Sequence, residues 1–257
     1  MVTALRDLYV TFVQFVRTFG ALQLFLCKLI MHSPSVMFRR FGLVVGQVYN
    51  SGALSLVIIM VCSLFVGAVL GLQGFDTLSR FNAEESVGTF AGFALIKELG
   101  PVITALLFAG RAGTALASEI GLMKATDQLS AMEMMGVNPI RRVVVPRFLG
   151  GVIAMPFLVA IFSVVGLFGS QLVAVSLLGV DIGAFWQQLQ QNLASEDVYE
   201  GILKSIVFGG AASLIAVWEG YNSIPTAEGV GRATTRTVVI TAITVLIFNF
   251  IITAWML

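Results

Sequence analysis

Long apolar stretches are the feature that most constrains this chain. From Ser51 to Leu72, and again from Phe148 to Val180, the sequence contains no Asp, Glu, Lys or Arg. A helix needs about 20 mainly apolar residues to cross the hydrocarbon core of a bilayer. Because 58% of the residues are hydrophobic and only 11% are charged, against about 25% charged in a typical soluble domain, lipid must solvate much of the surface. We therefore expect an all-α integral membrane protein.

Five stretches are long enough to cross a membrane. We expect transmembrane helices at about residues 51–72, 87–110, 148–178, 201–220 and 237–256. The third is longer than a bilayer requires, so it must tilt, bend or extend beyond the lipid. The second contains Lys97 and Glu98, the fourth contains Lys204 near its start, and the fifth contains Asn249.

The first 47 residues differ from these stretches. Between Thr3 and Thr18, polar side chains recur every three or four positions with apolar residues between them. This spacing predicts an amphipathic helix that lies in the membrane interface. His32-Ser33-Pro34 is expected to break that helix. We therefore divide the chain into N-terminal interfacial helices, residues 1–47, and a membrane domain, residues 48–257.

The basic residues predict the orientation in the membrane. If the N-terminus is cytoplasmic and the five helices alternate, 12 of the 15 lysines and arginines fall on the inner side and only Arg80 falls outside, as the positive-inside rule requires. The C-terminus is then on the outer side. The outer connection at about 180–199 has acidic residues but no Lys or Arg. Its apolar residues, such as Phe185 and Leu189, have helical spacing, which predicts a short helix on the outer surface.

The inner loop at 111–147 is much longer than a connection requires. Apolar residues from Ile120 to Met135 have helical spacing and are interleaved with charges, which predicts a short amphipathic helix with a methionine-rich face. Gly136 suits the end of a helix, and Pro139 blocks its continuation. Because methionine adapts to partner surfaces, we interpret this segment as a docking helix. The alternative is a helix that packs on its own bundle.

Several other classes of function find no support in the sequence. No phosphate-binding Gly-x-x-x-x-Gly-Lys-Ser/Thr loop is present. The single histidine, His32, cannot build a Cys/His zinc site, and no nucleophile motif accompanies it. A net charge of +1 without a basic run does not favour nucleic acid. The energy for any transport must therefore come from a partner or from an ion gradient.

Three blocks of the sequence resemble MlaE-type permeases, the membrane subunits of Mce-associated ABC transporters. They read FALIKELGPVITALLFAGR at 93–111, AGRAGTALASEIGLMKATDQLSAMEMMGVNPIRRVVVPR at 109–147, and GYNSIPTAEGVGRATTRTVV at 220–239. The resemblance runs from about Val48 to the C-terminus. It implies a homodimer in the inner membrane of a Gram-negative bacterium.

The resemblance also implies a set of partners. Each protomer would dock a cytoplasmic ABC ATPase, which binds ATP and Mg²⁺, so the chain itself would be a permease without cofactor or enzymatic activity. A STAS-domain subunit would bind the ATPase, and a hexamer of Mce-domain subunits would sit on the periplasmic face. The complex would move glycerophospholipid between the inner membrane and the periplasmic Mce-protein carrier, and so maintain outer-membrane lipid asymmetry.

Two groups of residues are candidates for function. On the family pattern, one group couples the chain to the ATPase, the alternative being local capping and surface charge: Glu119, Asp127, Glu133, Met134 and Gly136. The other group is expected to bind substrate, because ionisable or strongly polar groups within a span usually face a cavity or a partner: Lys97, Glu98, Lys204 and Asn249.

Each substrate-binding candidate also has a structural interpretation. Lys97 could meet a lipid phosphate, or it could belong to a fixed ion pair. Neighbours on a helix point about 100° apart, so Lys97 and Glu98 should each find other partners. Lys204 could form a surface salt bridge with Glu200, one turn before it, and Asn249 could form an interhelical hydrogen bond. Gly100-Pro101 should loosen the helix beside them.

Other mechanisms remain open on the sequence alone. An ion-gradient-driven secondary transporter could use Glu98 as its proton carrier, although the expected inverted repeats are not evident. An Mce-linked importer of another lipid, such as a sterol, is a further alternative, and so is a membrane scaffold that transports nothing.

Overall fold

The computed structural model describes the backbone of residues 2–256 and the side chains of residues 17–18, 20–38 and 40–256. Over residues 2–256 it is helical, without a β-strand, and six stretches are long and apolar enough to cross a membrane. The prediction of an all-α membrane protein is confirmed. Five of these stretches correspond to the five predicted spans, and the sixth, Gly20–Phe38, belongs to the N-terminal helix.

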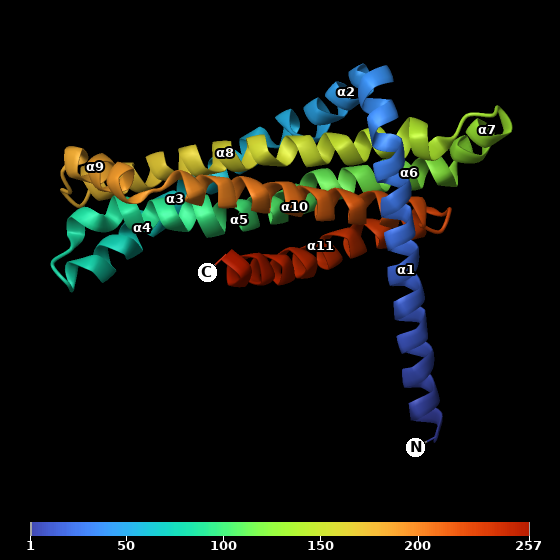
Figure 1. The fold of residues 1–257 in the computed structure, drawn as a ribbon, viewed down its shortest axis with the longest axis horizontal. Coiled ribbons are helices and arrows are strands. Elements are labelled where there is room, and N and C mark those ends of the chain that lie inside the picture. Colours follow the sequence, from blue (N-terminus) through green and yellow to red (C-terminus); the bar gives the residue numbers. More distant parts are fainter. Residues whose placement is uncertain (1, 257) are drawn as a thin grey trace.

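Five helical passes run back and forth along the long axis of the molecule (Figure 1). Their bounds are α2 Phe41–Ser51 with α3 Leu56–Ser79; α4 Val87–Phe93, α5 Gly100–Phe108 and α6 Thr114–Ala125 in one pass; α8 Val145–Ser176; α10 Ser195–Tyr221; and α11 Ala227–Met256. The short helix α9, Ile182–Asn192, joins α8 to α10, as predicted for the 180–199 connection. The even shorter α7, Gln128–Met134, precedes α8.

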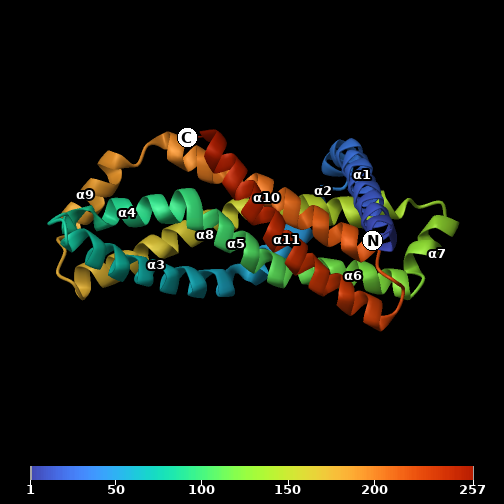
Figure 2. The ribbon, with the colours of Figure 1, turned by 90° about the horizontal axis from the view of Figure 1, so that it is seen from below.

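The connections gather at two opposite ends of the bundle. The α3–α4 turn and α9 lie at one end, whereas α7 and the α10–α11 turn lie at the other (Figures 1 and 2). We call these the α9 end and the α7 end. Such an arrangement is what alternating membrane crossings would produce.

The N-terminal helix α1, Val2–Arg39, runs across the other helices rather than along them (Figure 1). Its contacts with the bundle are mainly apolar: Phe25 packs against Trp218 with ring centroids 5.2 Å apart, and Leu29 and Val36 are buried. Ser35 of α1 also accepts a hydrogen bond from Arg141. A helix in this direction fits the membrane interface, which stays a prediction. The predicted amphipathic pattern at 3–16 falls on side chains outside the described ones.

The predicted break at His32-Ser33-Pro34 is wrong, because α1 continues through Pro34 and ends only at Arg39. Proline removes one backbone hydrogen bond, but nearby side chains satisfy other carbonyls of the same turns. Ser33 Oγ donates to the carbonyl of Leu29 at 2.8 Å, and His32 Nδ1 lies 2.7 Å from the carbonyl of Lys28. The predicted domain boundary at residue 47 falls inside α2.

The second pass is longer than predicted. It runs as 42 residues from Glu84 to Ala125, so the helix continues through Arg111, where a loop was expected to begin. Two π-helical turns interrupt it, at Ala94–Leu99 and Ala109–Gly113. They contain Lys97 with Glu98, and Arg111, respectively. The backbone stays helical through both π-helical turns, but the charged side chains within them no longer follow the regular spacing of an α-helix.

The packing around α8 relies on glycine. A Cβ atom on Gly67 of α3 would lie 1.9 Å from the carbonyl oxygen of Gly166, and one on Gly169 would lie 2.3 Å from that of Leu64. Only residues without a side chain allow this approach, which is a common way to join helices in lipid. Helices α3 and α8 therefore form a close-packed pair.

Candidate functional site

Two charged residues of the second pass, Lys97 and Glu98, lie in the π-helical turn Ala94–Leu99, directly before Gly100-Pro101. Because proline has no N–H, it cannot donate to the carbonyl one turn earlier, that of Lys97. Lys204 takes this place: its Nζ lies 3.0 Å from the Lys97 carbonyl oxygen. The predicted loosening at Gly100-Pro101 is confirmed. Single-turn π-helical segments often occur at functional sites.

Lys204 is completely buried and forms the centre of the cluster. Its Nζ is 2.7 Å from Glu98 Oε1, 2.9 Å from Glu200 Oε1 and 2.8 Å from Thr253 Oγ1. The predicted pair between Lys204 and Glu200 is present, but the interpretation of a surface salt bridge is wrong, because the side chain of Lys204 is 0% exposed. Its partners come from the π-helical turn, from α10 itself and from α11, and sequence spacing could not show this.

Glu98 connects the second pass with both of the last two helices. It accepts a hydrogen bond from Asn249 Nδ2 at 3.1 Å and another from Thr253 Oγ1 at 3.1 Å, in addition to its ion pair with Lys204. Asn249 thus makes the interhelical hydrogen bond that was one of its two interpretations. A single carboxylate therefore holds α10 and α11 against the pass that contains it.

Lys97 faces the other side of the cluster. Its Nζ lies 3.1 Å from Asp197 Oδ1 and 3.0 Å from Glu200 Oε2, and about a third of its side chain (32%) is exposed. The expectation that Lys97 and Glu98 have separate partners is confirmed. With all groups ionised, three carboxylates face two ammonium groups, so the cluster has one net negative charge.

We call the seven residues that these contacts join the charge cluster: Lys97, Glu98, Asp197, Glu200, Lys204, Asn249 and Thr253. All four predicted substrate-binding residues belong to it. Asp197 and Thr253 were missed. Asp197 lies one turn before Gly201, where the predicted fourth span begins, and an acidic residue at the edge of a span is a signal that could have been used. A threonine within a span is too common to stand out. Among the described side chains, no group of His, Cys, Asp and Glu is placed to hold a metal ion.

The second candidate region lies at the α7 end. The predicted single helix from Ile120 to Met135 is wrong: α6 ends at Ala125, the chain reverses at Asp127, and α7 covers only Gln128–Met134. Asp127 has a positive φ of 57°, which an aspartate tolerates better than most residues. Gly136 ends the segment with a φ of 72°, as predicted for a helix cap.

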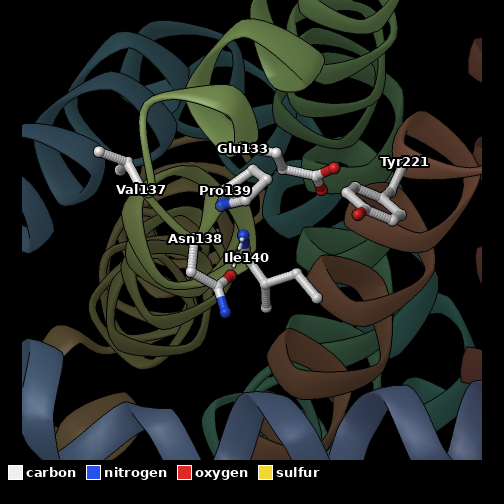
Figure 3. Close-up of a pocket in the computed structure, with 7 residues that line it drawn as sticks. Glu133, Val137, Asn138, Pro139, Ile140 and Tyr221 are labelled. Atoms are coloured by element: carbon white, nitrogen blue, oxygen red, sulfur yellow. Dashed lines mark hydrogen bonds between the residues drawn. The ribbon is translucent and has the colours of Figure 1, made fainter.

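One apolar residue of α7 is buried, whereas the methionines at its end are exposed. Leu129 is buried, whereas Met134 is 84% exposed and Met135 is also exposed. Beside it lies a pocket of about 350 Å³ lined by Glu133, the 136–140 turn and Tyr221. In Figure 3 the Glu133 carboxylate points toward the Tyr221 ring, and the Asn138 side chain accepts a hydrogen bond from the Ile140 N–H at 3.0 Å.

Glu119 does not belong to this surface. It lies on α6, near a different pocket, and its Oε2 is 3.1 Å from Arg147 Nη2 of α8. The structure therefore groups Asp127, Glu133, Met134 and Gly136 at the tip of the molecule and leaves Glu119 in an ion pair between two passes. The family pattern could not separate them, because all five lie in one continuous block of sequence.

Paired charges within a bundle of apolar passes and an exposed tip at one end define a multi-pass helical membrane protein of the transporter type. The family of the MlaE permease matches residues 44–255, and the chain belongs to this family. It is 47% identical over 245 residues to the intermembrane phospholipid transport system permease protein MlaE of Haemophilus influenzae, covering 95% of this chain and 94% of that protein.

The chain also matches more distant relatives. The chain is 41% identical over 212 residues to a probable ABC transporter permease protein of Rickettsia typhi, with 82% of each chain covered. It is 31% identical over 209 residues to the chloroplastic TRIGALACTOSYLDIACYLGLYCEROL 1 protein of Arabidopsis thaliana, covering 81% of this chain and 60% of that protein.

Proposed function

We propose that this chain is the permease subunit of an ABC transporter that moves glycerophospholipid between the inner membrane and a periplasmic carrier. The main observation in support of this proposal is that one continuous pass, Glu84–Ala125, connects the charge cluster with α7. From Glu98 to the end of α6 the pass extends about 40 Å, at about 1.5 Å per residue. This pass is therefore a stiff element that can transmit a movement of α7 to the charge cluster.

The charge cluster is proposed as the polar part of the lipid path. Lys97 is its accessible ammonium group, whereas Lys204 is enclosed. A lipid phosphate would compete with Asp197 for Lys97, and the net negative charge of the cluster would keep that contact weak. A weak contact suits a carrier that must release its cargo. The exposed apolar side chains of α11, such as Ile247 and Phe250, would accompany the acyl chains.

The α7 end is proposed as the docking surface for an ATPase that binds ATP and Mg²⁺. Met134 and Met135 offer exposed, adaptable contacts, and Glu133 offers a charge. Exposed apolar patches of this kind commonly mark interaction sites. In this proposal two copies of the chain pair in the membrane, each with an ATPase, and a STAS-domain subunit binds the ATPase. A hexamer of Mce-domain subunits covers the α9 end.

The orientation that goes with this proposal places the N-terminus and the α7 end in the cytoplasm and the C-terminus in the periplasm. The distribution of charged residues supports this orientation. Arg141, Arg142 and Arg147 follow α7, whereas acidic residues outnumber the single arginine, Arg80, in the sequence at the α9 end. Single-cysteine labelling from outside the cell at Met134 tests it, and labelling there would overturn it.

The decisive experiment purifies the chain from its native membrane and reconstitutes it with the partners that remain bound. We expect a stoichiometric ATPase, co-purified glycerophospholipid in the mass spectrum, and ATP-dependent transfer of that lipid to a periplasmic acceptor. Transport by the chain alone under a proton gradient would instead establish a secondary transporter. A sterol as the only bound lipid would reject the proposed cargo.

A further inference from the structure

Arg111 is a further charged residue of the second pass, and its surroundings differ from those of Lys97 and Lys204. It lies in the π-helical turn Ala109–Gly113, roughly 20 Å along the helix from Glu98. Its Nη1 donates to the carbonyl oxygen of Asn50 at 2.6 Å and approaches Ser55 Oγ at 3.4 Å. These two acceptors flank the point where α2 ends and α3 begins.

The guanidinium of Arg111 has no acidic counterpart. Among the described side chains, no carboxylate lies within ion-pair distance of it, although every intramembrane lysine of the charge cluster has two. The nearest candidate in sequence, Glu119, is already held by Arg147. A guanidinium has five N–H groups, and the protein contacts of Arg111 involve only Nη1. It therefore retains both charge and donors for another acceptor.

A pocket of about 180 Å³ lies beside Arg111. Its polar lining comes from Gln47, Asn50 and Ser51 of α2 together with Arg111 and Glu119, and its apolar lining includes Leu54 and Ala115. Two side-chain amides and two opposite charges face this space, and the carboxylate of Glu119 is paired with Arg147, which is not part of the lining. Tyr49, which is exposed on the same helix, has the character of a residue at the boundary between lipid and water.

We propose that this pocket binds the phosphodiester group of a membrane phospholipid from the leaflet at the α7 end. Arginine is suited to phosphate because its planar fork of donors matches phosphate oxygens, and Gln47 and Asn50 supply further donors. The exposed Leu54 would then lie against the start of the acyl chains. Basic pockets between transmembrane helices on the cytoplasmic side are known to hold lipid headgroups.

This headgroup pocket is distinct from the charge cluster. In the cluster each ammonium group is paired with two carboxylates, whereas in the pocket the lining carboxylate of Glu119 is paired with Arg147, so Arg111 has no acidic partner among the described side chains. We infer that lipid is held more firmly here than at the cluster. Because Arg111 also holds Asn50 and Ser55, a bound headgroup would share the guanidinium that fixes the α2–α3 junction. In the proposed orientation, which rests on the proposed function, this leaflet is the cytoplasmic one.

The test is photocrosslinking of lipid to the full chain. A benzophenone amino acid replaces Leu54, and the purified complex is placed in nanodiscs of phosphatidylethanolamine and phosphatidylglycerol. Irradiation should yield a phospholipid adduct at this position. Arg111→Gln keeps a donor for the Asn50 carbonyl but removes the charge, and it should lower the adduct about tenfold. Arg111→Lys, which keeps the charge, should restore most of it.

Two controls separate the pocket from bulk lipid and from misfolding. The same photoreactive residue at the exposed Val57 reports ordinary acyl contact and should not respond to Arg111→Gln. Arg80→Gln removes an exposed arginine at the α9 end and should leave the Leu54 adduct unchanged. An equal adduct yield in Arg111→Gln and Arg80→Gln would overturn the proposal.

Excess inorganic phosphate distinguishes the two sources of a phosphate group. A lipid site keeps its adduct, because free phosphate lacks the acyl chains, whereas loss of the adduct would assign the pocket to a soluble anion and reject the lipid. The result is independent of transport. If the adduct behaves as expected but the reconstituted complex moves no lipid, the pocket stands and the proposed function fails.

Discussion

The charge cluster and the α7 tip show two opposite ways of placing charge in one membrane protein. In the cluster, five ionisable side chains from two passes pair with each other and with polar groups of a third, and Lys204 is fully buried. At the tip, Glu133 and Met134 lie on a seven-residue helix whose shape is set locally by Asp127 and Gly136. Changes in the cluster should therefore affect the fold, and changes at the tip should affect coupling alone.

The largest expected effect follows from Lys204→Met. The variant leaves Glu98 and Glu200 together without the ammonium group between them, and breaking a buried ion pair by removing one partner typically costs about 3–5 kcal/mol. The free energy of unfolding, measured by titration with SDS from mixed micelles, should fall by that amount.

Arg80→Met is the matched control for Lys204→Met. It breaks the ion pair with Asp76, in which both side chains are 73% exposed. Exposed pairs contribute about 0–1 kcal/mol, so this variant should unfold almost as the wild type does. Equal stability losses in the two variants would remove the distinction between buried and exposed charge at this end of the molecule.

The next effect concerns the third helix of the cluster. Thr253→Val preserves the shape of the side chain but removes the hydroxyl that bonds Glu98 and Lys204. Hydrogen bonds to charged groups contribute about 1.5–3 kcal/mol, and because both partners keep other contacts we expect the lower part of this range. Thr253→Ser retains the hydroxyl and should recover the lost stability. A Ser variant as unstable as the Val variant would indicate packing instead.

The sequence indicated which charged residues belong to the cluster, but it did not indicate how they pair. Charges within a span are conspicuous, so Lys97, Glu98 and Lys204 could be found directly. Their pairing could not, because Glu98 meets α11 through residues about 150 positions away. Local periodicity contains no information on such contacts. The enclosure of Lys204 depends on the same tertiary packing.

The length and hydropathy of the apolar stretches predicted the helical passes, whereas the sequence did not predict correctly where helices bend or end. The five passes and the α9 helix follow from apolar stretches. Pro34 was misleading, because α1 continues through it although the proline removes one backbone hydrogen bond. The division between α6 and α7 was missed, because Asp127 adopts a positive φ, which aspartate tolerates but rarely adopts.

At the tip, Glu133→Lys should act on coupling without changing the fold. The side chain lies beside an open pocket and forms no ion pair among the described residues, so stability should not change measurably. If α7 docks an ATPase, reversing its charge should lower ATP-dependent lipid transfer about tenfold, which corresponds to about 1.4 kcal/mol. Leu129→Pro, which breaks α7, should have the same consequence. The measurements are lipid transfer and ATP hydrolysis in proteoliposomes.

Glu228→Lys provides the comparison for Glu133→Lys at the same end of the bundle. Glu228 is exposed and pairs with Arg232 within one helix. We expect normal transfer from this variant. Full transfer in Glu133→Lys and Leu129→Pro would show that docking occurs elsewhere, even if the cluster behaves as described.

The smallest effect is expected from Gly136→Ala, which tests whether the tip is shaped locally. No atom lies within 4 Å of a Cβ at this position, so only the backbone opposes the substitution. At a φ of 72° the strain for a residue with a side chain is about 1 kcal/mol. Amide hydrogen exchange within α7 should therefore be about fivefold faster, with no change in the membrane passes. Gly136→Asn should show a smaller acceleration, because asparagine tolerates this conformation. Accelerated exchange that spread along α6 toward Glu98 would mean that the tip and the cluster share one cooperative unit, and the two regions could then no longer be treated as separable.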